Sequence, residues 1–256
     1  MHSLFEIQHL SYAYHTMQGE TAALSDITFT VNTGDFVAIV GPSGCGKSTL
    51  LNLLAGMLTP ESGTLLLNGT PLTADSRCHI GYMLQQDNLL EWRSIWKNVL
   101  LGLEIRHEVT EESCSYAKQL LKQYGLEKFS HSKPSQLSGG MRQRAALVRT
   151  LVLKPDLLLL DEPFSALDYQ TRLSVSNDIG SIIQKEKKTA ILVTHDLAEA
   201  VSLADRIIIL TERPGRIHRI IPVAFPEQLT PMERRDHADF KTYFNLIWKE
   251  LHHETT

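Results

Sequence analysis

The nine residues "GPSGCGKST", positions 41–49, decide the fold of this chain. They satisfy the phosphate-loop pattern G-x-x-x-x-G-K-[ST], and they stand between a strand-like run, "DFVAIV", and the helical apolar spacing of "STLLNLLAGML". Glycines let backbone N–H groups curl around phosphate oxygens, and the lysine reaches the β and γ phosphates. The pattern therefore predicts a nucleotide site. Its predicted loop residues are Gly41, Pro42, Ser43, Gly44, Cys45, Gly46, Lys47, Ser48 and Thr49.

Two acidic residues follow an apolar run in "LLLLDEP", residues 157–163. We expect Asp161, at the strand end, to lie beside a magnesium ion that the Ser48 hydroxyl also ligates. Glu162 can then orient or deprotonate the water that attacks the γ-phosphate. A solvated strand edge is the plainer alternative, and the phosphate loop upstream argues against it.

Three further positions are candidates for the same site. His195 ends the apolar run of "ILVTHD", so we expect it at the carboxyl edge of a parallel sheet, near the γ-phosphate, although a lone histidine is more often structural. Gln85, after "IGYML", is a candidate to link magnesium or the attacking water with the segment that follows it. For adenine stacking the choice between Tyr14 and Tyr12 stays open, because both lie in the N-terminal strand region.

Strand-like and helical runs alternate through the chain. Apolar strands are expected at residues 35–40, 156–161, 189–194 and 206–210, with helices at 171–188 and 196–204. This alternation indicates a parallel sheet covered on both faces. Between the strands, about residues 86–154 have the texture of a helical insertion, in which Thr110 is the expected N-cap of one helix and Gly125 follows its end.

Composition limits the possible partners and compartment. Lys plus Arg number 25 against 29 Asp plus Glu, and the net charge of −4 gives no reason to expect nucleic acid as a partner. The three cysteines are widely spaced, which favours a reducing cytosol over a disulfide framework or a zinc cluster. No apolar run approaches the roughly 18 residues of a membrane span, so any membrane role is expected to be peripheral.

A second candidate phosphate site is "LSGGMRQR", residues 137–144, where a hydroxyl and two glycines open a helix with free N–H groups. Taken in order, the motifs of this chain resemble the ATP-binding subunit of an ABC transporter. The motifs that carry the resemblance are Tyr14, "GPSGCGKST", Gln85, "LSGGMRQR", "LLLLDEP", "SALD" and "ILVTH". The resemblance covers roughly residues 3 to 220.

The resemblance implies an α/β fold with a P-loop NTPase core. The core has a mainly parallel sheet, an N-terminal antiparallel β subdomain and the helical insertion. The ABC ATPase domain is expected over residues 1–225. The C-terminal helical tail, residues 226–256, falls outside the resemblance, and its own sequence predicts one helix over 233–251.

In that family two subunits pair head to tail, which explains the two phosphate sites. The resemblance implies a homodimer in which Ser138, Gly139 and Gly140 contact ATP held by the partner's phosphate loop. Asp168 of "SALD" then lies at the subunit junction. ATP and Mg²⁺ are the implied cofactors, with Ser48, Gln85 and Asp161 as the metal positions, and closure on ATP would be the mechanical stroke.

A finer resemblance, in "QQDNLLEW", "THDLAEAVSLADRIIIL" and "ERPGRI", is to importers of nitrate, sulfonates, taurine and related solutes such as thiamine-precursor pyrimidines. That group commonly has proline where this chain has Glu91, so the loop is expected to be less rigid. Leu89, Leu90 and Trp92 are expected either to receive a permease helix or to pack the core of the insertion.

These features predict an ATPase that drives solute import from the cytoplasmic face of the membrane. Its implied partners are two integral-membrane permease subunits and, in the same system, an extracytoplasmic solute-binding protein. The alternative is a soluble ABC ATPase that remodels a non-membrane partner complex. Relatives with long coiled coils are excluded, because only 97 positions separate Gly41 from Ser138.

Overall fold

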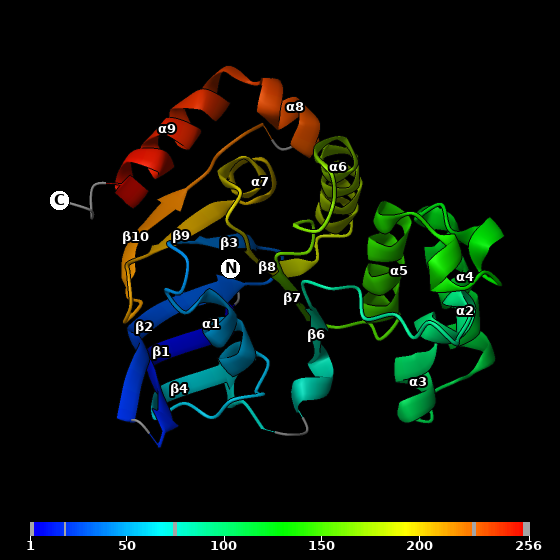
Figure 1. Cartoon of the computed structure of the whole chain (residues 1–256), viewed down its shortest axis with the longest axis horizontal. Coiled ribbons are helices and arrows are strands. Elements are labelled where there is room, and N and C mark those ends of the chain that lie inside the picture. Colours follow the sequence, from blue (N-terminus) through cyan, green and yellow to red (C-terminus); the bar gives the residue numbers. More distant parts are fainter. Residues whose placement is uncertain (1–2, 18, 74–75, 227–228, 253–256) are drawn as a thin grey trace.

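The larger of two sheets forms the centre of the molecule (Figure 1). The computed structural model describes residues 3–17, 19–73, 76–226 and 229–252. The strand order of the larger sheet is β10-β9-β3-β8-β7-β6, and all neighbours are parallel except β10, which pairs antiparallel with β9 at the edge. Its strands are β3 Phe36–Val40, β6 Ile80–Met83, β7 Leu157–Asp161, β8 Thr189–Val193, β9 Arg206–Leu210 and β10 Ile217–Pro222. The predicted, mainly parallel sheet is confirmed.

Both faces of this sheet are buried, as its continuous apolar strands require. Alternate residues of each strand enter different cores, so Val37 and Ile39 pack with α1 (Lys47–Leu54), while Ala38 and Val40 belong to the core on the other face. The helices of that second face are α5 Gly139–Leu151, α6 Tyr169–Lys185 and α7 Leu197–Leu203. The carboxyl ends of the strands therefore meet at one edge, where ligands of parallel sheets bind.

The smaller sheet is antiparallel, with the strand order β2-β1-β4-β5, as predicted for the N-terminal subdomain. Its strands are β1 Ser3–Thr16, β2 Gly19–Asn32, β4 Ser62–Leu67 and β5 Thr70–Pro71. Its apolar face shares one buried core with α1 and one face of the larger sheet. This packing places the end of β1, with its tyrosines, beside the phosphate loop.

Helix α1 is shorter than its apolar spacing predicts. The spacing of "STLLNLLAGML" and the proline that follows it predict a stop near Thr59 and Pro60, but the helix ends at Leu54, with Ala55 as the C-cap. Gly56 follows with a φ of +68°, a left-handed conformation that favours glycine and closes a helix. The helix therefore ends before the glycine, and beyond it Leu58 packs against the core without helical structure, while Met57 is exposed.

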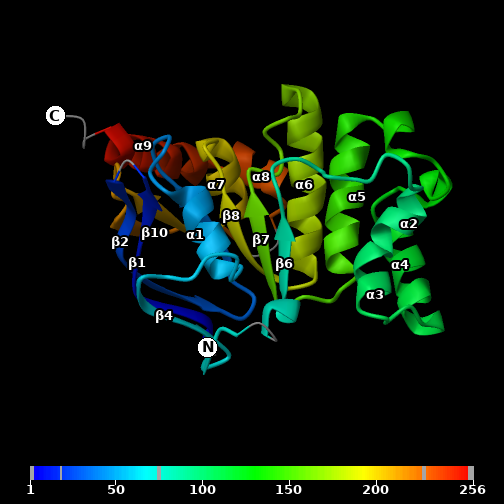
Figure 2. The same ribbon diagram turned by 60° about the horizontal axis from the view of Figure 1, so that its bottom comes forward.

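The helical insertion lies at the end of the molecule opposite the N-terminal sheet (Figure 2). It consists of α2 Ile95–Val99, α3 Leu101–Ile105, α4 Glu111–Gln123 and α5, with short 3-10 turns at Glu127–Phe129 and Pro134–Gln136. Another 3-10 turn, Ser76–His79, precedes β6. Thr110 caps α4 by accepting a hydrogen bond from the Ser113 N–H, and Gly125 follows the helix with a φ of +70°, so both end signals are confirmed.

The C-terminal tail contains two helices, so the prediction of one helix over 233–251 is wrong. Helices α8 (Pro231–Asp236) and α9 (Ala238–His252) meet at His237, which has an extended backbone. Tertiary contacts fix this corner: the ring of Phe225 packs edge-on against His237 and lies under the Arg234 guanidinium. Residues 227–228 and 253–256 of the tail lie outside the described residues. Within the described ranges, the helices lack the combined length and apolarity needed to cross a bilayer.

Candidate nucleotide site

A cavity of about 590 Å³ lies at the carboxyl edge of the larger sheet, over the phosphate loop. It brings together residues predicted from four separate motifs. The residues that line it are Tyr14, Ser43, Gly44, Gly46, Lys47, Ser48, Thr49, Glu162, His195 and Arg213. Gly41, Pro42 and Cys45 of the predicted loop are not among the residues that line this cavity.

The phosphate loop is held by its lysine and by two left-handed glycines. Lys47 is only 9% exposed, and its Nζ donates hydrogen bonds of 2.9 Å to the carbonyls of Gly41 and Pro42. Gly44 and Gly46 have φ angles of +79° and +102°, and a Cβ at Gly46 would also meet Leu24 and the Ala23 carbonyl. The amine therefore lies in the middle of the loop, where phosphate oxygens would replace the carbonyls.

Cys45 has a structural position in the loop. Its side chain is buried in the same core as α1 and β2, and its Sγ lies 3.8 Å from the Lys47 amine. Burial raises the pKa of the Cys45 thiol, with Lys47 opposing that rise. The side chain is therefore a packing group.

Asp161 ends β7 next to the Ser48 hydroxyl, as the metal prediction requires. Ser48 Oγ donates to Asp161 Oδ1 at 3.3 Å, and the Tyr82 hydroxyl donates to Oδ2 at 3.4 Å. Burial raises the pKa of the Asp161 carboxyl, while these two hydrogen bonds lower it. A hydroxyl and a carboxylate so close together form a hard-oxygen donor pair that suits Mg²⁺.

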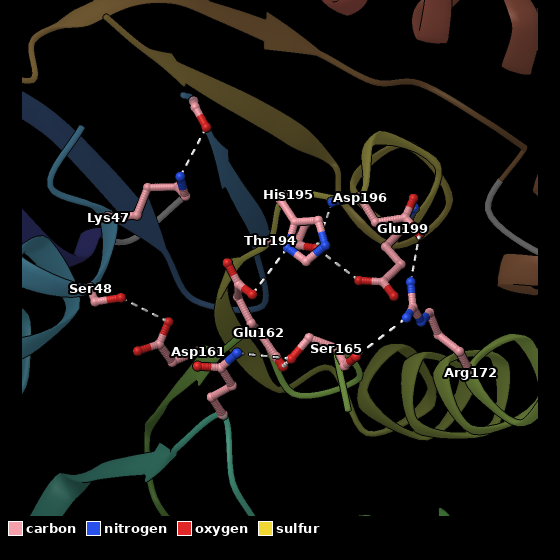
Figure 3. Close-up of polar contacts among 12 residues, drawn as sticks. Lys47, Ser48, Asp161, Glu162, Ser165, Arg172, Thr194, His195, Asp196 and Glu199 are labelled. Carbon is pink, nitrogen blue, oxygen red and sulfur yellow. Dashed lines mark hydrogen bonds and ion pairs between the residues drawn. The ribbon is translucent and has the colours of Figure 1, made fainter. Parts of the chain in front are cut away.

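Glu162 and His195 both line the cavity, and their side chains contact each other (Figure 3). The Glu162 carboxylate lies 3.0 Å from His195 Nδ1. Glu162 has a φ of +43°, and its N–H bonds the Val193 carbonyl, so the chain turns sharply as it leaves β7. The turn directs the carboxylate away from Asp161 and toward the histidine that follows β8.

Gln85 lies near these residues but contacts neither Ser48 nor Asp161 by a hydrogen bond. Its side-chain amide donates to Ser165 Oγ at 3.2 Å, and that hydroxyl donates to the Glu162 carbonyl at 2.9 Å. Its backbone carbonyl accepts from the buried Gln143 of α5. Gln85 thus joins the loop after Glu162 to the helical insertion.

The two candidate tyrosines have different surroundings. Tyr14 lines the cavity, and its hydroxyl lies 3.0 Å from Thr49 Oγ1. Tyr12 packs edge-on against Tyr14, with ring centroids 5.1 Å apart, and contacts the N-terminal core. The geometry favours Tyr14 as the ring beside a nucleotide base.

The "LSGG" segment lies away from this cavity. Ser138 is the N-cap of α5 and accepts from the Met141 N–H, while Gly140 packs so closely on α6 that a Cβ would meet Thr171 and Val175. Ser138 and Gly140 line a separate hollow of about 290 Å³. Asp168 caps α6 next to it through the Thr171 N–H, and this hydrogen bonding lowers the pKa of Asp168.

Comparison with known proteins agrees with these motifs. The sequence profile described as "ABC transporter" matches residues 24–165. The chain belongs to the ABC transporter family. It is 46% identical over 252 residues to the uncharacterized ABC transporter ATP-binding protein YtlC of Bacillus subtilis, which covers 97% of this chain and 96% of the relative.

Two importer proteins are among the relatives of this ABC protein. The taurine import ATP-binding protein TauB of Pelagibacter ubique is 41% identical, over 83% of this chain and 80% of the relative. The aliphatic sulfonates import ATP-binding protein SsuB of Bacillus licheniformis is 40% identical, over 93% of this chain and 89% of the relative.

A solved structure of the ATP-binding cassette MJ0796 has the same fold. Described as a dimeric post-hydrolysis state bound to ADP and Pi, it matches with a TM-score of 0.74 and 30% identity, over 87% of this chain and all of that cassette. The resemblance inferred from the motifs is confirmed, and this chain has the ATP-binding, ATP-hydrolysing domain of its family.

Sequence reasoning missed two arginines of this ABC domain. Arg213 lines the cavity, and Arg172 of α6 contacts the loops on either side of it. Arg213 could have been found, because it follows β9, whose carboxyl end shares an edge with Asp161 and His195. Arg172 gave no such signal, because its partners Ser165, Leu167 and Asp196 lie in loops whose positions the helical spacing does not describe.

Proposed function

We propose that this protein is the ATP-hydrolysing subunit of a binding-protein-dependent ABC importer. The observation that carries the ATPase mechanism is the meeting of Lys47, Glu162 and His195 around one cavity. The import direction is supported by the names of the taurine and sulfonate relatives. We propose nitrate, a sulfonate, taurine or a related small solute, such as a thiamine-precursor pyrimidine, as the cargo.

In this proposal the phosphate loop binds ATP with Lys47 between the β and γ phosphates, and Tyr14 stacks on adenine. Ser48 and Asp161 hold Mg²⁺, with Gln85 as the third metal position. The ion would neutralise charge on the phosphates and on the Asp161 carboxylate, whose burial otherwise disfavours ionisation. Among the described residues no group of three or more His, Cys, Asp or Glu could hold a metal, so phosphate and water oxygens would complete the coordination.

Glu162 is the proposed general base for in-line attack of water on the γ-phosphate. Its carboxylate faces the cavity and is held at 3.0 Å by His195 Nδ1. Proton transfer from the water to this carboxylate would make the attacking oxygen more nucleophilic. His195 would keep the carboxylate in place and contact the γ-phosphate.

The second phosphate site is proposed to act across a homodimer. Ser138, Gly139 and Gly140 would present the N–H groups at the start of α5 to the γ-phosphate of the partner's ATP. Asp168 would lie at the junction. The dimeric state of the solved cassette supports this arrangement.

We propose that two permease subunits dock on the helical insertion at the cytoplasmic face of the membrane. Leu89 belongs to the buried core of the insertion, whereas Trp92 is 75% exposed, so Trp92 is the proposed contact, with half-buried Leu90 beside it. An extracytoplasmic solute-binding protein would deliver the cargo to the permease. We also propose the division into an ATPase domain, residues 1–225, and a helical tail, residues 226–256.

The testing experiment is a pull-down of the tagged chain from detergent-solubilised native membranes, with every co-purifying chain identified by mass spectrometry. We expect a multi-span permease and a solute-binding protein, whose ligand then names the cargo. A matched Trp92→Ala bait should lose the permease and keep ATPase activity. Recovery of soluble partners alone, in repeated preparations, would replace the importer with an ABC ATPase that remodels a soluble complex.

A further inference from the structure

Arg172 joins two loops that border the nucleotide cavity (Figure 3). It lies in the second turn of α6, and its side chain is 23% exposed. Its Nη2 donates to the carbonyls of Ser165 at 3.3 Å and Leu167 at 3.1 Å, and its Nη1 lies 3.7 Å from Asp196 Oδ2. One planar guanidinium therefore holds the loop that follows Glu162 and the loop that follows β8.

Each loop that Arg172 contacts also carries one residue of the Glu162 and His195 pair. The Ser165 hydroxyl donates to the Glu162 carbonyl and accepts from Gln85, so the position of Ser165 affects the backbone of the proposed base. Asp196 directly follows His195 in the chain. A shift of the guanidinium would therefore move the two loops, and with them the two side chains, relative to each other.

The two carboxylate oxygens of Asp196 make different contacts. Oδ1 accepts from the N–H groups of Ala198 and Glu199 at 2.8 and 3.2 Å, which caps α7, while Oδ2 is the oxygen that faces Arg172. Because Oδ1 alone accepts the N–H groups at the start of α7, Oδ2 is available for the contact with Arg172.

Stability alone does not explain this arginine. Its Nε is buried and has no hydrogen-bond partner in the described part of the chain. A buried donor without a partner costs free energy, and well-packed apolar residues often replace buried ion pairs without loss. The side chain instead offers a rigid fork that sets the distance between two loops, which an apolar residue or a lysine cannot reproduce.

We infer that Arg172 is a positioning residue of the ATPase site, which fixes the loop of Glu162 against the loop of His195 in the hydrolysis geometry. This inference rests on the proposed roles of Glu162 and His195. Arg172 does not touch the nucleotide cavity, so it acts on the hydrolysis step and leaves nucleotide binding to the phosphate loop.

The test compares Arg172→Gln with Arg206→Gln in steady-state ATPase assays of the full chain. Arg206 is the matched control, because it is 21% exposed, pairs with Asp35 at 2.8 Å and bonds the Thr30 carbonyl, away from the site. We expect Arg172→Gln to lower kcat about 10- to 100-fold with KM for ATP unchanged, as a small misplacement of a catalytic group does. Arg206→Gln should leave kcat unchanged at a similar loss of thermal stability.

Further variants separate positioning from folding. Arg172→Lys keeps the charge but loses the fork, so kcat should recover only in part. Asp196→Asn keeps the helix cap and removes the ion pair, and the double variant with Arg172→Gln should be no slower than Arg172→Gln alone. If Arg172→Gln fails to fold, the lysine variant gives the same kcat and KM comparison.

Three outcomes would overturn the inference: an unchanged kcat in Arg172→Gln, a rise in KM alone, or an equal loss of kcat in Arg206→Gln. Glu162→Gln, assayed in parallel, separates this inference from the proposal on which it rests. Rapid hydrolysis by Glu162→Gln would remove Glu162 from its role. An inactive Glu162→Gln with a normal Arg172→Gln would refute the role of Arg172 alone.

Discussion

The phosphate loop and the "LSGG" segment each place glycines at the start of a helix, but their surroundings differ. The phosphate loop encloses its lysine and lies in one cavity with Glu162 and His195. The start of α5 is open: Ser138 and Gly139 are exposed, and the hollow beside them is lined by no acidic side chain. We propose that both regions bind a phosphate through N–H groups, and among the residues that line the two hollows the acidic group proposed to activate water, Glu162, belongs to the first.

A phosphate-binding helix start is therefore not by itself a catalytic site. The second region is capped by its own serine, whereas α1 begins at Gly46, which has no side-chain cap. In the proposed function the first region supplies the groups for hydrolysis, and the second adds donors to a nucleotide that another subunit holds.

The largest effect is expected from Glu162→Gln. The amide cannot accept a proton at neutral pH, so hydrolysis should fall about 10²- to 10⁴-fold while ATP binding persists. Single-turnover hydrolysis and equilibrium nucleotide binding measure the two quantities separately. Lys47→Ala is the contrasting variant, because it should lose binding as well as turnover. Near-normal hydrolysis by Glu162→Gln would mean that Glu162 is not the group that activates water beside the phosphate loop.

Ser138→Arg should reduce turnover about 100-fold, because it blocks donors that act on the partner's nucleotide. A 1:1 mixture with Lys47→Ala should recover roughly a quarter of wild-type turnover, since half of the pairs are hybrids and each hybrid holds one intact site of two. Ser135→Arg, which adds the same charge at an exposed position nearby, is the matched control. A mixture that stays inactive would contradict the model of shared sites.

The sequence predicted the phosphate-loop region well, but it did not predict features that depend on tertiary contacts. Patterns with fixed spacing, such as the phosphate loop and "LLLLDEP", placed Lys47, Asp161 and Glu162 correctly at one edge, because the ends of parallel strands converge. The break at His237 could not be predicted, because it depends on contacts of Phe225 and Arg234 that helical periodicity does not describe. Arg172 was missed for the same reason, since its partners come from loops that are distant in the sequence.

A buried acid on the hydrolysis side gives a pH test. Glu199 is 3% exposed, and burial and the nearby Asp196 raise its pKa to about 7, while the Thr194 hydroxyl, Arg172 and Arg235 oppose the rise. The unfolded chain releases this proton near pH 4.5. The stability contribution of Glu199 is therefore complete below pH 4.5, declines as the pH rises, and is lost above the folded pKa.

Glu199→Gln cannot ionise, so it should be more stable than the wild type by about 1–3 kcal/mol at pH 8 and nearly equal at pH 4.5. Urea unfolding at both pH values measures the difference. Asp168→Asn is the contrasting variant on the "LSGG" side: hydrogen bonding lowers the pKa of Asp168, so its contribution is present at neutral pH and is lost only under acid conditions. If the change in the free energy of unfolding on Glu199→Gln did not depend on pH, Glu199 would not be the group that holds a proton in the folded state at neutral pH.

The smallest effect is expected at Glu91, which pairs with a residue of α5, the helix that the "LSGG" segment opens. The sequence predicted a less rigid loop here, but Glu91 lies 3.0 Å from Arg142 of α5, and Arg142 also binds Asp87 at 2.8 Å. Because Glu91 is half exposed, Glu91→Gln should lower the free energy of unfolding by only about 0.2–1 kcal/mol, and less at high salt. A double-mutant cycle with Arg142→Gln isolates the pair, and Glu108→Gln, an exposed acid with no ion pair in the described structure, is the control. A coupling energy of zero would mean that Glu91 adds nothing to the ion pair that Asp87 makes with Arg142 of α5.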